Sequence, residues 1–134
     1  MTELEKSELV ISRILSLLME WGIQESTLQF SELELEEKDF GPFFWPCVEW
    51  LISEGVIRAQ DTARTIEAVQ SGEVVNPVLT SYGFKLLGQK LTMGQGEAQL
   101  AERVKEVSRS GTSYSGVGDL IGGILGGFTK SISS

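Results

Sequence analysis

Two short stretches of this 134-residue chain constrain its fold more than any other feature. Residues 50–57 have the sequence Trp-Leu-Ile-Ser-Glu-Gly-Val-Ile, which predicts an apolar helix that Gly55 ends and that runs into a strand. Residues 79–87 have the sequence Leu-Thr-Ser-Tyr-Gly-Phe-Lys-Leu-Leu, which predicts a strand end that enters another helix. A polar, hairpin-like segment separates the two stretches. The predicted order is therefore helix, strand, loop, strand, helix.

A long amphipathic helix is predicted before these stretches, from about Glu3 to Trp21. Thr2 and Glu5 have the spacing of a capping box, and Gly22 is a suitable stop. Apolar residues then recur at helical spacing, and they include Val10, Ile11, Ile14, Leu15, Leu17, Leu18 and Trp21. This apolar stripe is expected to face the core.

Two shorter helices are predicted between the first helix and Gly55. Ser31 and Glu34 repeat the capping-box spacing, so a second helix is expected to run to about Asp39, after a short strand at residues 28–30. Gly41-Pro42 breaks the pattern, and Pro46 suits a first helical position. A third helix is therefore expected from Pro46 to Glu54, with Phe40, Phe43, Phe44 and Trp45 packed in the turn before it.

Beyond Gly55 the pattern alternates between strand and helix. A strand begins at residues 56–58, and residues 65–69 fit either a strand or a short helix. Residues 74–79 are β-branched, but Pro77 restricts them to an edge strand or a bulge. Thr80 or Ser81 caps a helix that is expected to run through about Lys90.

The last third of the chain predicts a helix, a linker and an apolar tail. Glu97 to Val107 has helical spacing, residues 92–96 are a break, and residues 108–118 are rich in serine and glycine. In the tail, large apolar residues alternate with glycines spaced by four, and the apolar residues are Leu120, Ile121, Ile124, Leu125 and Phe128. Three interpretations stay open: the tail packs on its own domain or on a sister subunit, it inserts into a partner, or it lies on a membrane surface.

The order of elements over residues 4–91 resembles that of winged-helix domains. The resemblance depends on the helix that ends at Gly55 and on the Leu-Thr-x-x-Gly-x-x-Leu-Leu pattern at residues 79–87. It implies an α+β fold that is mostly α, with a small β-sheet. The expected organisation is a winged-helix-like domain at residues 1–91, a C-terminal helix at residues 92–109, and a glycine- and serine-rich linker with the apolar tail at residues 110–134.

Most winged-helix domains bind DNA through the third helix, but the charges of this chain argue against that function. The net charge is −8 and the pI is about 4.5, and between Lys38 and Arg58 there is no cation. Phosphate binding needs lysine or arginine at the surface. The densest acidic run lies just before the third helix and contains Glu32, Glu34, Glu36, Glu37 and Asp39. It is interpreted either as a solvated helix face or as a docking surface for a basic protein.

The sequence offers no catalytic, cofactor or metal signature. There is no histidine, no phosphate-binding glycine loop with its lysine, and no metal-ligand spacing. Cys47 has no cation beside it, so it is expected to be a buried and inert thiol. A single cysteine and an acidic N-terminus without a signal-peptide pattern indicate a reducing cytoplasm.

The leading hypothesis is a non-enzymatic protein that binds another, basic protein. Its concrete form is a small bacterial immunity or antitoxin-type protein that neutralises a basic toxin. The first alternative is a transcriptional regulator that binds DNA as a dimer, which would need Arg58, Arg64, Arg103, Lys105 and Arg109 on one face. The second alternative is a membrane-associated adaptor that uses the tail. The sequence leaves open whether the chain forms a homo-oligomer.

Overall fold

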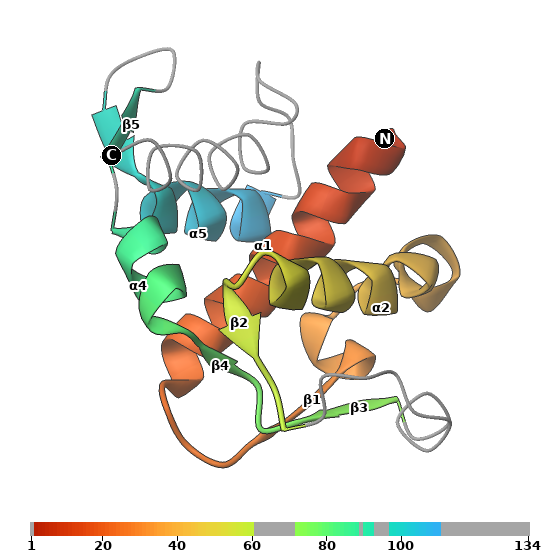
Figure 1. Ribbon diagram of the computed structural model, residues 1–134. Coiled ribbons are helices and arrows are strands. Elements are labelled where there is room, and N and C mark those ends of the chain that lie inside the picture. The colour runs from red at the N-terminus through yellow and green to blue at the C-terminus, as the bar shows by residue number, and fades with distance from the viewer. Residues whose placement is uncertain (1, 61–71, 89, 93–96, 111–134) are drawn as a thin grey trace.

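The computed structural model describes residues 2–60, 72–88, 90–92 and 97–110 (Figure 1). Over these residues the fold is α+β and mostly helical, as the sequence predicts, and the short strands pair in twos. In chain order the elements are α1 (Glu3–Trp21), β1 (Thr27–Gln29), the 3₁₀ helix η1 (Phe30–Leu33), α2 (Glu37–Ser53), β2 (Ile57–Arg58), β3 (Glu73–Val75), β4 (Val78–Leu79), α4 (Ser81–Leu87), β5 (Lys90–Thr92), β6 (Glu97–Gln99) and α5 (Leu100–Ser110).

Helix α1 has the bounds that its capping pattern predicts. The Thr2 hydroxyl accepts the Glu5 N–H at 3.1 Å, and the Glu5 carboxylate accepts the Thr2 N–H at 3.0 Å. Because the Thr2 backbone and hydroxyl stabilise the charged form, the pKa of Glu5 lies below its usual value. The helix ends at Gly22, whose φ of 73° is a conformation that glycine adopts without strain. The apolar stripe of α1 is buried in the core at Val10, Ile11, Ile14, Leu15 and Leu18.

Helix α2 is much longer than the sequence predicts. The expected helix from Pro46 to Glu54 is in fact the second half of one helix that begins at Glu37, and Pro42 and Pro46 lie inside it. Each interior proline removes a helical hydrogen bond at a cost of about 3 kcal/mol. The aromatic residues expected in a preceding turn are therefore helical, and Phe44 is buried in the core with rings of Phe30 and Trp45 at its edge. Burial of these aromatic side chains outweighs the local preference of proline.

Helix α2 ends where the sequence predicts. Gly55 has φ of 76°, its N–H donates to the Ile52 carbonyl at 3.0 Å, and the Val56 N–H donates to the Leu51 carbonyl at 3.0 Å. These two bonds form a Schellman motif, which turns the chain directly into β2.

The strand predicted at residues 74–79 is present but is broken at Asn76-Pro77. Its first half, β3, pairs antiparallel with β1, and its second half, β4, pairs antiparallel with β2. Asn76 has φ of 51°, and its side chain accepts the Ser26 N–H at 3.1 Å and donates to Gln60 at 2.9 Å. The segment from β3 to β4 therefore joins the strand that follows α1 to the strand that follows α2.

The two stretches that most constrain the fold meet at the start of α4. Thr80 caps α4 by accepting the Gly83 N–H at 2.9 Å, and its own hydroxyl donates to the Gly55 carbonyl at 2.5 Å. The Thr80 N–H donates to the Val56 carbonyl at 3.0 Å. Gly83 is buried, and a Cβ on it would lie 2.2 Å from that Val56 carbonyl oxygen. The Leu-Thr-x-x-Gly pattern thus docks α4 on the end of α2.

The elements after α4 differ from the prediction. The helix expected through about Lys90 ends at Leu87, with Gly88 at its C-cap, and Lys90 begins β5. The helix expected from Glu97 begins instead at Leu100, because residues Glu97–Gln99 form β6 and pair antiparallel with β5. Because residues 90–92 and 97–99 pair as strands, they belong to neither of the two predicted helices. Helix α5 also continues through Ser110, beyond the expected end at Val107.

Helix α5 packs against α1 (Figure 1). Val104 of α5 contributes a fully buried side chain to the core that the two helices share. Arg13 of α1 joins three elements: its Nε donates to the Ser108 carbonyl of α5 at 2.7 Å, and its Nη1 donates to the Leu33 carbonyl of η1 at 2.7 Å. Both carbonyls lie near the C-terminal ends of their helices, where a cation is favoured. The predictions for residues 65–69, 111–118 and the tail lie outside the described residues.

Candidate functional site

The acidic run lies in three short pieces instead of one helix. Glu32 belongs to η1, Glu34 follows it in a left-handed conformation with φ of 56°, and Glu36 precedes α2. Glu37 and Asp39 lie in the first turn of α2. The prediction of a second helix from Ser31 to Asp39 is therefore wrong. Buried Leu33 fixes the 3₁₀ turn in the core, and the left-handed residue after it ends that turn.

The capping box of this segment is one that the sequence analysis missed. The Glu32 carboxylate accepts the Gln29 N–H at 3.0 Å, so the box uses Gln29 and Glu32 and not Ser31 and Glu34. Glu37 and Asp39 also stabilise the positive N-terminal end of α2. Part of the acidic run thus has a structural role.

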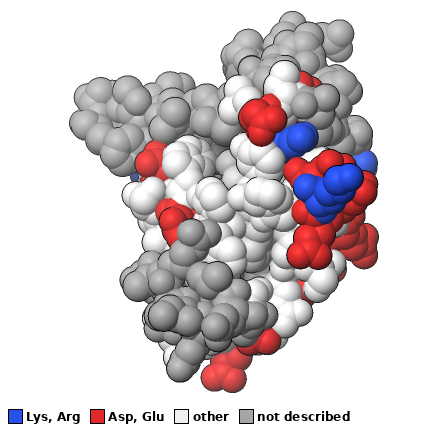
Figure 2. Space-filling model, turned by 90° about the vertical axis from the view of Figure 1, so that its right-hand side faces the viewer, with Lys and Arg blue, Asp and Glu red and all other residues white. Residues whose placement is uncertain are grey.

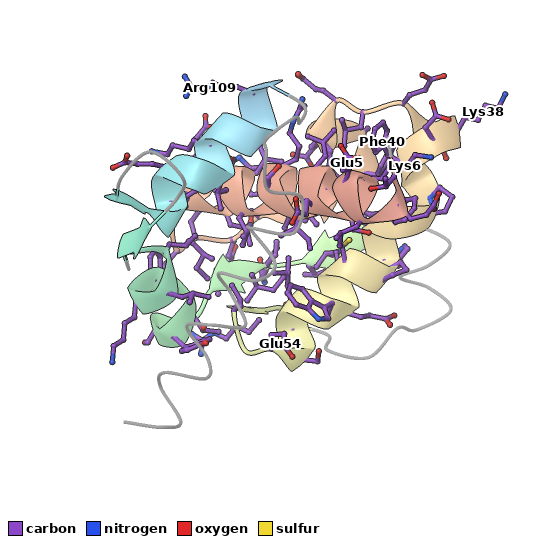
Figure 3. All side chains as sticks on the ribbon, turned by 90° about the horizontal axis from the view of Figure 1, so that it is seen from above. Glu5, Lys6, Lys38, Phe40, Glu54 and Arg109 are labelled. Atoms are coloured by element: carbon purple, nitrogen blue, oxygen red, sulfur yellow. The ribbon has the colours of Figure 1, made fainter. Side chains whose placement is uncertain are left out.

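All five acidic side chains of the run are exposed. Figure 2 shows acidic side chains gathered at its right-hand edge, on the side of the molecule where α2 begins. Lys38 is exposed among them, and Figure 3 shows it pointing away from the body of the molecule. The segment from Glu32 to Asp39 therefore presents five carboxylates and one cation to solvent, which favours a positively charged partner.

The outward face of α2 follows directly from this acidic segment. Its exposed residues recur at helical spacing, and they are Pro42, Pro46, Glu49 and Ser53. Phe43 and Trp50 lie beside them, half-buried against the core. This face carries neither lysine nor arginine. It is apolar at its centre, with Glu49 and Glu54 towards its C-terminal end.

The cations of the described residues are divided among different elements. Arg58 is exposed on β2, whereas Lys105 and Arg109 are exposed on α5. Figure 3 shows Arg109 and Lys38 at opposite sides of the molecule. Lys105 and Arg109 line a pocket between α1 and α5 of about 550 Å³, together with Ser16, Met19, Glu20 and Ser108. Because Glu20 lies in that pocket, its lining has mixed charge. Arg64 lies outside the described residues.

Cys47 is buried, as the sequence predicts. Its Sγ donates to the Ser7 carbonyl of α1 at 3.7 Å, and burial raises the pKa of the thiol to about 12. At neutral pH the side chain is therefore a protonated thiol that packs between α1 and α2. Within the described ranges, no three acidic or cysteine side chains come together in a group that could hold a metal ion.

Arg13 and Gly83 are the residues whose roles sequence reasoning missed. Arg13 is the one cation inside the apolar part of α1, and such a charge signals a buried or half-buried partner. The contact at Gly83 has a weaker signal. The glycine belongs to the Leu-Thr-x-x-Gly pattern, but a glycine in a predicted helix by itself indicates only a weak helix former.

The comparisons with known proteins show no relative of this chain: no protein-family model, no curated protein and no solved structure matches it. None of the helices in the described part of the chain combines the length and the apolar character needed to cross a bilayer.

Proposed function

We propose that this chain is a winged-helix-like protein that binds a basic protein and performs no catalysis. The order of elements supports the fold assignment, since α1, β1, η1, α2, β2 and the β3–β4 segment follow one another as helix, strand, short helix, helix, strand and strand. The pairing of β1 with β3 and of β2 with β4 is compatible with a small antiparallel sheet and its wing.

One observation carries the functional proposal: the helix in the recognition position has the wrong charge for DNA. Over α2 and the segment before it, the exposed charged side chains are carboxylates with the single exception of Lys38. Carboxylates repel phosphates, whereas they attract a lysine- or arginine-rich surface and accelerate its association. An immunity or antitoxin-type protein that covers a basic toxin in the bacterial cytoplasm is the concrete form of this proposal.

The test uses affinity purification of partners from the host, followed by binding measurements on charge-reversal variants. Glu34→Lys and Glu36→Lys are combined, because Glu32 and Glu37 have the structural roles described above. The matched control combines Glu25→Lys and Glu102→Lys, which reverse two exposed carboxylates elsewhere.

The variant with Glu34→Lys and Glu36→Lys is expected to bind the partner at least about tenfold more weakly, or roughly 1.4 kcal/mol. Its binding is also expected to depend less on salt concentration. The control pair is expected to change binding much less. Equal binding by both pairs would contradict the acidic surface. A steep salt dependence of duplex DNA binding would favour the regulator instead.

A further inference from the structure

We infer that the outward face of α2, from Pro42 to Ser53, is the centre of the binding surface, and that it takes a helix with an apolar stripe and lysine or arginine at both ends. This inference rests on the proposed function and specifies the partner of the same site. It starts from the arrangement of polar and apolar side chains along α2, which combines an apolar centre with two acidic ends.

The apolar centre comes from the prolines and the half-buried aromatic residues of α2. Pro42 and Pro46 are exposed and lie one turn apart, with Phe43 and Trp50 beside them. An amphipathic helix with exposed polar residues would be the ordinary choice for a solvated face, and proline is the least favourable residue in a helix interior. Pro42 and Pro46 therefore give the outward face of α2 an apolar surface that the stability of the helix itself does not require.

The acidic ends define the charge of the occupant. Glu36, Glu37 and Asp39 lie at the N-terminal end of this face, and Glu49 and Glu54 lie towards its C-terminal end. Figure 2 shows acidic side chains on both sides of an uncharged band, and Figure 3 shows Lys38 and Glu54 at opposite ends of α2. At 1.5 Å per residue, the gap between the two acidic groups, from Asp39 to Glu49, is about 15 Å. A helix about three turns long, with an apolar stripe between two basic ends, matches this spacing.

The same charges argue against a second copy of this chain as the occupant. Two α2 faces placed against each other would bring carboxylates at one end of each face close to carboxylates of the other, whichever direction they ran. The face itself has no cation, and the acidic segment before it supplies only Lys38 to offset these carboxylates. Like charges across an interface cost free energy, and this favours a different, basic chain.

The test titrates the full-length protein with two synthetic peptides of equal charge. One has leucine along one helical face and lysine at both ends, and the other has serine in place of leucine. Tryptophan fluorescence and amide chemical-shift mapping report the affinity and the location of binding. The leucine peptide is expected to bind at least about tenfold more tightly, with shift changes concentrated in α2. Equal affinities, or shift changes outside α2, would overturn the inference.

Two substitutions at Pro46 separate the apolar contact from the effect of the proline ring. Replacing an exposed proline inside a helix favours folding, so neither variant is expected to unfold. Pro46→Ala keeps the surface apolar and is expected to bind like the unaltered protein. Pro46→Lys places a cation at the centre of the face and is expected to weaken binding of the leucine peptide at least about tenfold. Phe84→Ser, which removes an apolar side chain that is 44% exposed on α4, is the control and is expected to leave binding unchanged.

The outcomes distinguish this inference from the proposed function. If Glu34→Lys with Glu36→Lys weakens binding of the host partner while Pro46→Lys does not, the acidic segment binds alone and the inference is wrong. If neither variant matters, both proposals fail. If sedimentation shows a dimer that Pro46→Lys dissociates, a second copy covers the face and the inference is overturned.

Discussion

Replacing Gly83 with alanine tests whether the Leu-Thr-x-x-Gly pattern is a docking device. In an isolated helix this substitution would stabilise by about 1 kcal/mol, because glycine is a poor helix former. In the folded chain the new Cβ would lie 2.2 Å from the Val56 carbonyl oxygen and 3.2 Å from its carbon. Both are backbone atoms in the turn that follows α2, so no side-chain rotation can relieve the contact. The sign of the measured change therefore decides between local propensity and tertiary packing.

The expected magnitude follows from what must move. Separating α4 from β2 by about 1 Å strains the bonds from Thr80 to the carbonyls of Gly55 and Val56, each worth about 0.5–1.5 kcal/mol. Overpacking adds about 1–3 kcal/mol, and the gain in helix propensity offsets about 1 kcal/mol. Together these contributions predict a net loss of about 1–5 kcal/mol, centred on about 3 kcal/mol, which is a large fraction of a typical domain's stability.

Urea unfolding followed by tryptophan fluorescence measures this loss as a fall in midpoint of roughly 1–2 M. Gly88→Ala, at the C-cap of the same helix, is the matched control, because its Cβ would meet only carbonyl oxygens at 3.6 Å, an ordinary contact distance. Its midpoint is expected to stay close to that of the unaltered protein. A Gly83→Ala protein as stable as the Gly88→Ala protein would refute the docking role of Gly83.

Two further predictions concern α1 and its contacts. Arg13→Lys removes the fork that reaches the Ser108 and Leu33 carbonyls, so it is expected to cost about 1.5–3 kcal/mol and to speed hydrogen exchange in α5; unchanged protection of α5 would contradict this. Cys47, with its pKa raised to about 12 from about 9, keeps its proton in the folded state while the unfolded thiol ionises. The stabilisation that comes from keeping the buried thiol neutral is thus complete below pH 9 and is lost as pH rises towards 12. The loss in the free energy of unfolding is about 1.4 kcal/mol at pH 10. Denaturant titrations of Cys47→Ala should lack this alkaline loss. Equal alkaline losses in both proteins would count against the buried thiol.

The amino-acid sequence by itself determines the elements whose signals are local. Helix α1 begins at the Thr2 and Glu5 capping box and ends at Gly22, and α2 stops at Gly55, because side-chain caps and left-handed glycines act within a few residues. Pro77 likewise marks residues 74–79 as an irregular or edge strand from the sequence alone, because proline has no N–H to donate to a neighbouring strand. The absence of cations between Lys38 and Arg58 is also a property of the sequence alone.

The tertiary structure decides where local preference and packing disagree. Proline signals predict a short helix from Pro46, but burial of aromatic side chains such as Phe44 extends α2 back to Glu37. The acidic run has the spacing of a helix, yet the anchoring of Leu33 breaks it into a 3₁₀ turn and the start of α2. Pairing of β5 with β6 likewise shortens two predicted helices. The contacts of Phe44 and Leu33 join residues that are far apart in sequence, so no local pattern contains them. The pairing of β5 with β6 is closer in sequence, but the helical spacing of the same residues hides it.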